Sequence, residues 1–184
     1  MVEIKNFITP EQCNTLIQIC ESKLENLKVL GSDNEDEYRK AEGTWIDKND
    51  NDNNFISDML VEVSKLPKEN QESIHLVKYK IGGEYKNHHD FFHLNQSYTE
   101  AELAKGGQRT KSCLIYLNDN FKGGETVFPT IDVKVAPEQG KLIIWDNLNP
   151  DGSLNNDSLH AGLPVEEGIK YIAIVWIREN KFIP

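Results

Sequence analysis

Two adjacent histidines followed by an aspartate, His88, His89 and Asp90, are residues whose types and spacing could do chemistry. They lie in the segment 85–92, which reads YKNHHDFF. In a β-strand the side chains at positions i and i+2 share a face, whereas the side chain at i+1 points away. His88 and Asp90 would then face one way, as two of the three ligands of a non-haem Fe(II) site built from two histidines and a carboxylate. Taken alone, His88 and Asp90 are also consistent with an ordinary pair of solvent-exposed polar residues near a turn.

A third ligand would have to come from another strand, and His75, His93 and His160 remain. His160 is favoured because Lys170 follows it in the run IKYIAIVWI. Both faces of that run are mostly apolar, so Lys170 must reach solvent at the strand end or pair with an anion, because an unpaired buried ammonium costs several kcal/mol. We interpret Lys170 as a cationic socket for a carboxylated cosubstrate, close to a metal ligand.

Two helices are expected in the first part of the chain, where residues 1–70 would form a helical support within the same compact domain. Thr9 supplies an N-cap, Gln12 can complete a capping box, and Gly31 marks the expected end of the first helix. A second helix is expected over about residues 54–66. The apolar face of the first helix comprises Cys13, Leu16, Ile17, Cys20, Leu24 and Leu27.

After this helical part the hydrophobic pattern becomes alternating, which is typical of short strands. Turns rich in glycine separate the apolar runs. Helices followed by many short strands indicate a mainly β fold with N-terminal helices, a sandwich or squat barrel braced by helices, with residues 71–184 as the β part. The predicted strands are 73–81, 110–117, 126–128, 132–135, 141–146 and 169–177.

The composition restricts the partners and the compartment. Twenty Lys and Arg against thirty Asp and Glu give a formal net charge of −10, which disfavours nucleic acid and anionic lipid. Three cysteines at scattered spacings make no disulfide framework and fit a reducing compartment. We see no leader-like N-terminus and no apolar run long enough to span a bilayer. We therefore expect a cytoplasmic protein that binds neither nucleic acid nor membrane.

A series of motifs keeps a characteristic order over roughly residues 73–180. The motifs are Tyr79, Tyr85-x-x-His88-x-Asp90, GGQR at 106–109, YLND at 116–119, GGETVFP at 123–129, His160-Ala-Gly and Lys170. This ordered set resembles the catalytic domain of prolyl 4-hydroxylases, which are Fe(II)- and 2-oxoglutarate-dependent dioxygenases. The resemblance implies a double-stranded β-helix, or jelly roll.

The same resemblance implies roles for individual residues. His88, Asp90 and His160 correspond to the iron ligands, and we expect His89 to be dispensable for binding iron. Lys170 corresponds to the partner of the distal carboxylate of 2-oxoglutarate. The hydroxyl donors to that carboxylate would be Tyr79 and Thr126.

Residues on the substrate side are also implied by the resemblance. Arg109 and Trp176 match positions that line the substrate cleft, and we include Tyr85 as pocket wall. Arg178 is included too, although the family commonly has a histidine there, so this chain departs from the pattern at a position that bears on the substrate. The polar segment 93–105 is expected to be a mobile flap over the cleft.

The implied activity is hydroxylation of an unactivated C–H bond, C4 of a prolyl residue in a peptide or protein. It would consume O2 and 2-oxoglutarate and release succinate and CO2, with ascorbate in a supporting role. The alternatives are hydroxylation of a free amino acid and a jelly-roll module that binds metal without redox chemistry. Nucleic-acid demethylation is disfavoured by the acidic charge and by Lys170, because demethylases of this class typically bind 2-oxoglutarate with arginine.

Overall fold

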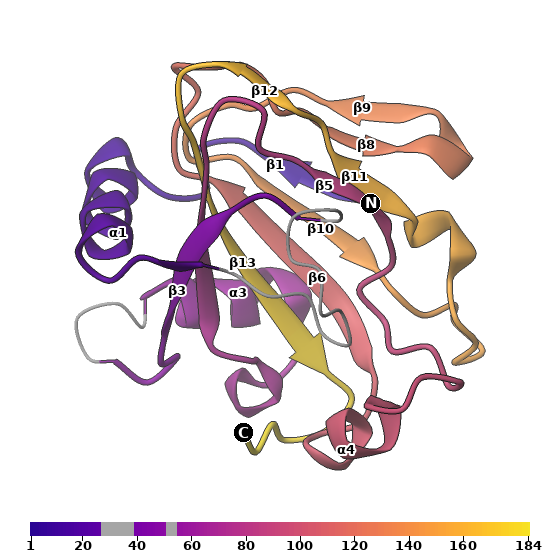
Figure 1. Ribbon diagram of the computed structural model, residues 1–184. Helices are drawn as coiled ribbons and strands as arrows, with labels where there is room; N and C mark the ends of the chain where they lie inside the picture. The colour runs from indigo at the N-terminus through magenta and orange to yellow at the C-terminus, as the bar shows by residue number, and fades with distance from the viewer. Residues whose placement is uncertain (27–38, 51–54) are drawn as a thin grey trace.

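Two antiparallel sheets facing one another form the body of the protein, as the computed structural model shows for residues 1–26, 39–50 and 55–184 (Figure 1). The larger sheet has, within these ranges, the order β1 (Val2–Ile4), β10 (Leu142–Asp146), β6 (Arg109–Tyr116), β13 (Lys170–Arg178), β4 (Ile74–Tyr79), β3 (Glu42–Ile46) and β2 (Glu25–Asn26). The smaller sheet has the order β5 (Tyr85–His88), β11 (His160–Gly162), β8 (Thr126–Phe128) and β9 (Val133–Val135). A short ribbon pairs β12 (Val165–Glu167) with β7 (Lys122–Gly123).

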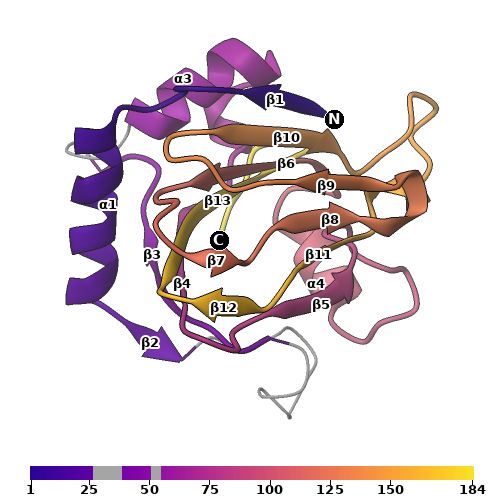
Figure 2. The ribbon, with the colours of Figure 1, turned by 90° about the horizontal axis from the view of Figure 1, so that it is seen from above.

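The helices cover the outer face of the larger sheet, opposite the smaller sheet (Figure 2). They are α1 (Pro10–Ser22) and α3 (Phe55–Ser64), and a short helix, α4 (Thr99–Ala104), lies near the C-terminus (Figure 1). Single turns of 3₁₀-helix occur at η1 (Lys68–Asn70), η2 (Pro129–Ile131) and η3 (Asn156–Ser158). No helix in the described ranges is long and apolar enough to cross a bilayer.

Strand β13 shows how the hydrophobic pattern builds two cores. All of its residues are buried, as the apolar run predicted. Tyr171, Ala173, Val175 and Ile177 pack with α1 and α3, whereas Ile172 packs between the two sheets. Because side chains alternate along a strand, Lys170 and Trp176 share the inner face with Ile172. The space between the sheets is therefore where a site can form.

The first helix begins as predicted and ends earlier than predicted. Thr9 accepts from the Gln12 backbone N–H at 3.2 Å, and the Gln12 side chain accepts from the Thr9 N–H at 2.9 Å, which completes the capping box. The helix stops at Ser22, so Leu24 lies beyond it, contrary to the predicted continuation. Leu27 and Gly31 lie outside the described residues. The second helix is confirmed over Phe55–Ser64.

The N-terminal part also contributes strands that the hydrophobic pattern did not predict. Strand β1 pairs with β10, and β3 pairs with β4 with Trp45 opposite His75. These are short strands at or near the edge of the sheet, too short to show a clear alternation.

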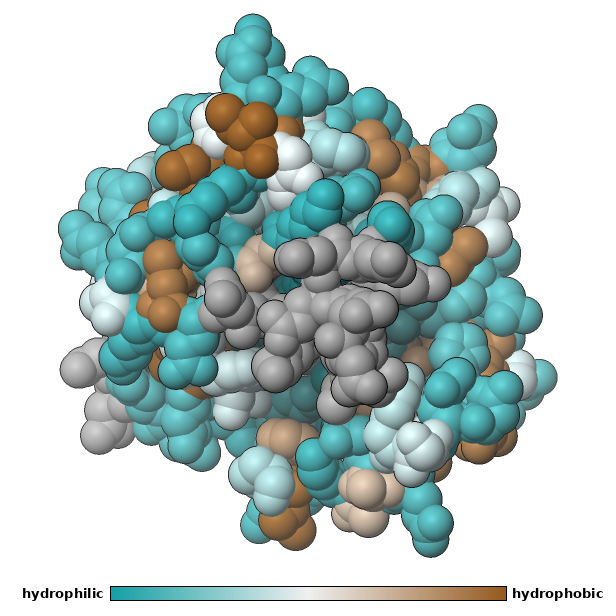
Figure 3. Space-filling model, viewed as in Figure 1, coloured by the Kyte–Doolittle hydropathy of each residue, from teal (hydrophilic) through white to brown (hydrophobic). Residues whose placement is uncertain are grey.

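The visible surface is mainly polar (Figure 3). Figure 3 shows a face that is mainly hydrophilic, with apolar side chains scattered over it. The segment 93–105, expected to be a flap, contains α4. Its mobility stays a prediction.

Candidate active site

His88, Asp90 and His160 meet between the two sheets, in the arrangement that a metal centre needs. His88 ends β5, Asp90 follows that strand, and His160 begins β11, which pairs with β5 so that His160 lies opposite His88. The His88 Nε2 atom lies 3.6 Å from Asp90 Oδ1, and His160 Nε2 lies 3.7 Å from Asp90 Oδ2. The three ligand atoms all lie within 4.8 Å of one another. Two imidazoles and one carboxylate are the donor set of non-haem Fe(II) sites.

Backbone carbonyls orient the two imidazoles. His88 Nδ1 lies 2.7 Å from the Lys86 carbonyl oxygen, and His160 Nδ1 lies 2.9 Å from the Ser158 carbonyl oxygen. A carbonyl only accepts, so each ring carries its proton on Nδ1 and presents the Nε2 lone pair to the centre of the site. Both histidines are therefore set in the tautomer that binds a metal.

The carboxylate is held by a buried chain of polar groups. The Ser112 hydroxyl donates to Asp90 Oδ2 at 2.6 Å, and the Asn147 amide donates to the same hydroxyl at 2.8 Å. Burial would raise the pKa of Asp90, but the adjacent His160 and His88 rings, with Arg109 and the Ser112 hydroxyl, lower its pKa below the usual range. Burial, and next the neighbouring His160, lower the pKa of His88. The site therefore favours an ionised Asp90 beside a neutral His88, the forms that bind a cation.

His89 lies apart from this cluster. Its Nε2 atom is 3.3 Å from the Asn156 carbonyl oxygen, and its ring stacks on Phe91 at a centroid distance of 4.4 Å. The structure therefore brings together His88, Asp90 and His160 and leaves His89 outside.

Lys170 occupies a closely fitted socket on the inner face of β13. The side chain is buried, and its ammonium donates to the Gly124 carbonyl oxygen at 2.6 Å. Gly124 has φ +67°, and a Cβ there would lie 3.0 Å from Lys170 Cδ, so glycine makes room for the lysine stem. Burial lowers the pKa of Lys170 to about 7, because Glu125 compensates only in part. Among the described residues Lys170 has no ion-pair partner, which fits a site for a carboxylate ligand.

Hydroxyl groups lie around the same socket. The Tyr79 ring centroid is 5.3 Å from Lys170 Nζ, and Tyr79 pairs with Lys170 across β4 and β13. Thr126 on β8 is buried, and its hydroxyl accepts from Tyr116 OH at 2.6 Å. Because this bond uses the oxygen of Thr126 as an acceptor, the Thr126 proton is free to be donated to a ligand.

Arg109 and Trp176 lie together at one side of the site. The Arg109 guanidinium carbon lies 3.9 Å from the centroid of the Trp176 ring. Arg109 also forms two bonds to Glu72, Nε to Oε1 at 2.7 Å and Nη2 to Oε2 at 2.9 Å, and its Nη1 lies 3.4 Å from the Asp90 carbonyl oxygen. Arg109 therefore connects the predicted substrate side to the metal ligand.

The other two residues expected on the substrate side differ in accessibility. Tyr85 stacks on His88 with ring centroids 3.6 Å apart, and the Arg39 guanidinium carbon lies 4.8 Å from the Tyr85 ring centroid. Arg178 is 0% exposed and donates to Glu72. Arg178 therefore has no surface open to a ligand in this structure.

The structure also adds residues that sequence reasoning did not include. Ser112 and Asn147 support Asp90, Tyr116 bonds to Thr126, and the Trp145 ring packs on His160 with centroids 4.7 Å apart. Ser112 and Tyr116 are spaced by an even number of positions on β6, so strand alternation could have placed both on one face. Asn147 follows a strand and carried no such signal.

Comparison with known proteins gives a consistent assignment. The sequence profile of the 2OG-Fe(II) oxygenase superfamily matches residues 74–178. A prolyl 4-hydroxylase homologue of Acanthamoeba polyphaga mimivirus is 33% identical over 180 residues, covering 97% of this chain and 74% of that protein. Prolyl 4-hydroxylase 2 of Arabidopsis thaliana is 32% identical over 204 residues, covering 97% of this chain and 67% of that protein. The chain spans 62% of the length of one further Arabidopsis relative.

Solved structures agree with the sequence relatives. The viral collagen prolyl hydroxylase of Paramecium bursaria Chlorella virus-1, in its 2OG complex, superposes with a TM-score of 0.77 at 28% identity, covering 96% of this chain and 94% of that chain. This chain belongs to the 2OG-Fe(II) oxygenase superfamily and is a 2-oxoglutarate-dependent dioxygenase. The predicted jelly roll and the resemblance to prolyl 4-hydroxylases are confirmed.

Proposed function

We propose that this dioxygenase hydroxylates C4 of a prolyl residue in a peptide or protein. The observation that carries the proposal is the meeting, in one interior space, of the His88, Asp90 and His160 cluster with buried Lys170, which has no ion-pair partner among the described residues. The similarity to prolyl 4-hydroxylases over nearly the whole chain supports a prolyl substrate.

The residues present fit the cofactors of this family. His88, Asp90 and His160 would hold Fe(II), and Lys170, with Thr126 and Tyr79, would hold the distal carboxylate of 2-oxoglutarate. When bound, these groups and O2 supply the oxidising power that turns C–H into C–OH, with release of succinate and CO2. The chain's own contribution is orientation: the ligand set leaves open coordination positions, and the socket fixes the cosubstrate at its far end.

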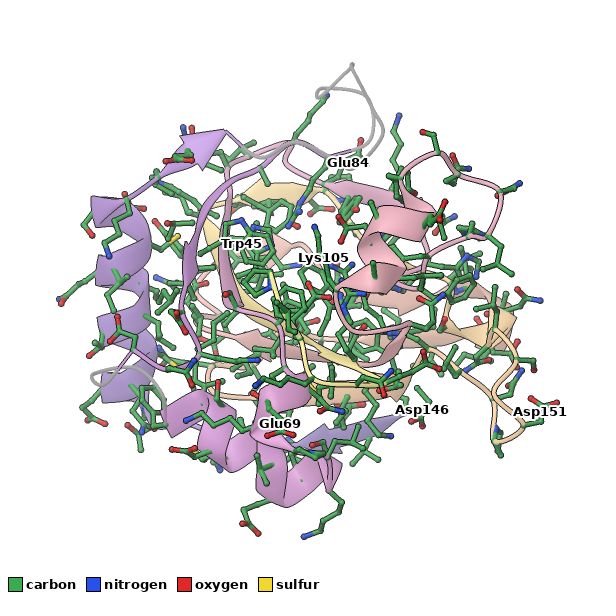
Figure 4. The ribbon with its side chains drawn as sticks, turned by 90° about the horizontal axis from the view of Figure 1, so that it is seen from below. Trp45, Glu69, Glu84, Lys105, Asp146 and Asp151 are labelled. Atoms are coloured by element: carbon green, nitrogen blue, oxygen red, sulfur yellow. The ribbon has the colours of Figure 1, made fainter. Side chains whose placement is uncertain are left out.

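A peptide ligand is supported by the surface beside the metal centre. Trp45 stacks on His75 with ring centroids 4.0 Å apart, and His75 neighbours Trp176 at 5.9 Å. Trp45 remains 49% exposed and is visible on β3 in Figure 4. Both ring nitrogens of His75 and the Trp176 indole nitrogen are buried without hydrogen-bond partners in the described structure. Trp45 is the exposed ring of this stack, and it offers a flat face on which a proline ring of an extended peptide can pack.

Two further features belong to the proposal. Ascorbate would support turnover by keeping the iron in its Fe(II) form. The protein would act in a reducing compartment such as the cytoplasm, which is supported by three buried cysteines that form no disulfide: Cys13, Cys20 and Cys113. The formal charge of −10 is the reason for excluding nucleic acid from the proposed partners.

The competing functions are less well supported. Hydroxylation of a free amino acid leaves the exposed Trp45 ring, stacked on His75, without a role. A metal-binding module without redox chemistry has no use for the buried ammonium of Lys170.

The proposal is tested with purified protein, Fe(II), 2-oxoglutarate and O2 on an array of proline-containing peptides. We expect a gain of one oxygen on the proline of some peptides, matched by one succinate per hydroxylation. The same peptides with Pro→Ala are the control. Hydroxylation of free proline but of no peptide, or succinate formation that no peptide stimulates, would contradict the proposal.

A further inference from the structure

Four charged side chains form a buried network directly behind the substrate side. Glu72 accepts from Arg109 Nε at 2.7 Å and from Arg178 Nε at 2.6 Å, both on the same oxygen, Oε1. Glu102 lies 3.4 Å from Arg178 Nη2. Two carboxylates therefore face two guanidinium groups, and Lys105 also pairs with Glu102 at 2.6 Å. Burial would raise the pKa of Glu72, but the charges and hydrogen bonds of the two arginines lower it below its usual range.

Arg178 also connects this network to the α4 segment. Its Nη1 donates to the Gly107 carbonyl oxygen at 2.7 Å and to the Glu102 carbonyl oxygen at 3.2 Å. Lys105, labelled in Figure 4, follows α4 and lies between Glu102 and Gly107 in the sequence. The pairing of β13 with β6 shifts register between Ile177 and Arg178, a bulge that redirects the side chain at the end of the strand. Arg178 therefore joins the catalytic sheet to the segment that carries α4.

The network reaches the metal ligand through two neighbouring residues. Arg109 Nη1 approaches the Asp90 carbonyl oxygen at 3.4 Å. Gln108 holds the next part of the chain, because its side chain accepts from the Phe92 N–H at 2.7 Å and donates to the Phe92 carbonyl oxygen at 2.9 Å. The segment 90–92 is thus held from the start of β6.

We propose that Arg178 is a positioning residue for peptide hydroxylation: by fixing Glu72 it holds the Arg109 guanidinium over Trp176 and beside Asp90. In the described structure Arg178 forms no hydrogen bond or ion pair with His88, Asp90 or His160, so it acts through Glu72 and through Phe92, whose ring centroid lies 4.6 Å from its guanidinium carbon. The inference rests on the proposed function for its kinetic part. It replaces the expectation from the sequence that Arg178 itself contacts the substrate.

Two substitutions separate the contact of Arg178 with Glu72 from its contacts with Glu102 and Gly107 in the α4 segment. Arg178→Met removes both, whereas Arg178→His keeps a donor close enough for Glu72 but too short for Glu102 and Gly107. We expect kcat/KM for the peptide to fall by about 10- to 100-fold in the Met variant, mostly through KM, and to stay within about threefold in the His variant. Adding Arg178→Met to Arg109→Met should lower kcat/KM by less than about threefold further, since both act on one contact.

Hydrogen exchange tests the same idea without an active enzyme. The Met variant should lose protection at 90–92 and in the α4 segment, whereas the His variant should lose it only in the α4 segment. If the parent enzyme hydroxylates no peptide, the proposed function is wrong. The exchange pattern still tests whether Arg178 positions residues 90–92, because it needs no turnover. Parent-like exchange at 90–92 in the Met variant would overturn the inference, as would a kinetic loss that is additive with Arg109→Met.

The His variant keeps the test decisive if Arg178→Met does not fold. A His variant with near-parent kcat/KM and a loosened α4 segment supports the inference. A His variant as impaired as Arg109→Met would contradict it. Glu102→Gln serves as the matched control, because the Glu102 carboxylate contacts Arg178 Nη2 only at 3.4 Å and pairs more closely with Lys105, so its loss should change kcat/KM by less than about twofold.

Discussion

Two groups of buried charges lie on the same side of the larger sheet and differ in how they are neutralised. In the Glu72 network, each carboxylate pairs with cationic side chains of the chain itself: Glu72 with Arg109 and Arg178, and Glu102 with Arg178 and Lys105. In the metal and cosubstrate region, Lys170 is buried without a counter-ion in the described structure, and Asp90 shares its carboxylate with two imidazoles. The charges of the Glu72 network are paired within the folded chain. The metal and cosubstrate region still needs one bound cation and one bound anion.

This difference separates scaffold from binding site. A buried charge left without a partner costs several kcal/mol, so a fold keeps one only where a ligand completes it. Fe(II) would supply the cation bound by the carboxylate and imidazole cluster, and the distal carboxylate of 2-oxoglutarate would supply the anion that pairs with Lys170. Substitutions should accordingly affect ligand binding in one region and the placement of other residues in the other.

The largest effect is expected from the metal ligands. His160→Ala should abolish iron binding and activity, because His88 and Asp90 alone do not supply the three protein ligands that hold Fe(II) in such sites. Iron content after anaerobic loading and gel filtration measures this. His89→Ala is the matched control and should load iron like the parent. An iron content of His160→Ala equal to that of the parent would show that the metal binds at another site.

Lys170→Met should weaken 2-oxoglutarate binding by at least about 30-fold, equivalent to about 2 kcal/mol, because it removes one partner of a buried charge pair. Iron loading should be unaffected, since Lys170 does not belong to the ligand cluster. Anaerobic titration calorimetry of the iron-loaded variant gives the affinity. An unchanged affinity would show that the cosubstrate binds away from Lys170.

Ser112→Ala should lower iron affinity or activity by about tenfold, because it removes the hydroxyl that orients Asp90 and leaves Asn147 without its acceptor. Competition with a chelator measures the affinity. Thr110→Ala is a control on the same strand, because its hydroxyl bonds to the Ile177 carbonyl oxygen and not to Asp90. Equal losses in the two variants would indicate damage to β6 instead of to the ligand.

The smallest effect concerns stability and pH in the ligand-free protein. The pKa of Lys170 is about 7, below the ordinary value of 10.5, so the unfolded chain binds more protons between these pH values. Charged Lys170 therefore destabilises the fold fully below about pH 7, and this penalty fades as the pH rises toward about 10.5.

Lys170→Met should consequently raise the melting temperature more at about pH 6 than at about pH 9. Thermal unfolding followed by circular dichroism measures both. Lys122→Met, which removes an exposed pair with Glu167, should change little at either pH. A gain for Lys170→Met that grows with pH would contradict the assigned direction of the pKa shift.

The sequence was most informative where a single strand carries the signal. The apolar run 169–177 predicted the strand in which Lys170 is buried, and the spacing of His88 and Asp90 selected the pair that the structure brings together. Even so, Asp90 lies just beyond β5, so alternation was only an approximate reason for that pairing.

Pairing between distant segments could not be predicted in the same way. Arg178 and Glu72 are separated by 106 positions, and only the folded chain shows that they neutralise each other. Strand β3 escaped prediction because exposed Trp45 does not fit a simple inner and outer pattern. Long-range partners decide burial at such positions, and local patterns carry no information about them.

The central claim is that Fe(II) and 2-oxoglutarate together complete the charges around His88, Asp90, His160 and Lys170. Anaerobic mixing of the protein with both should produce a visible metal-to-ligand absorption that saturates at one 2-oxoglutarate per chain. We predict this absorption in the parent and in His89→Ala, and its loss in His88→Ala. Its loss in His89→Ala alone, with retention in His88→Ala, would contradict the account.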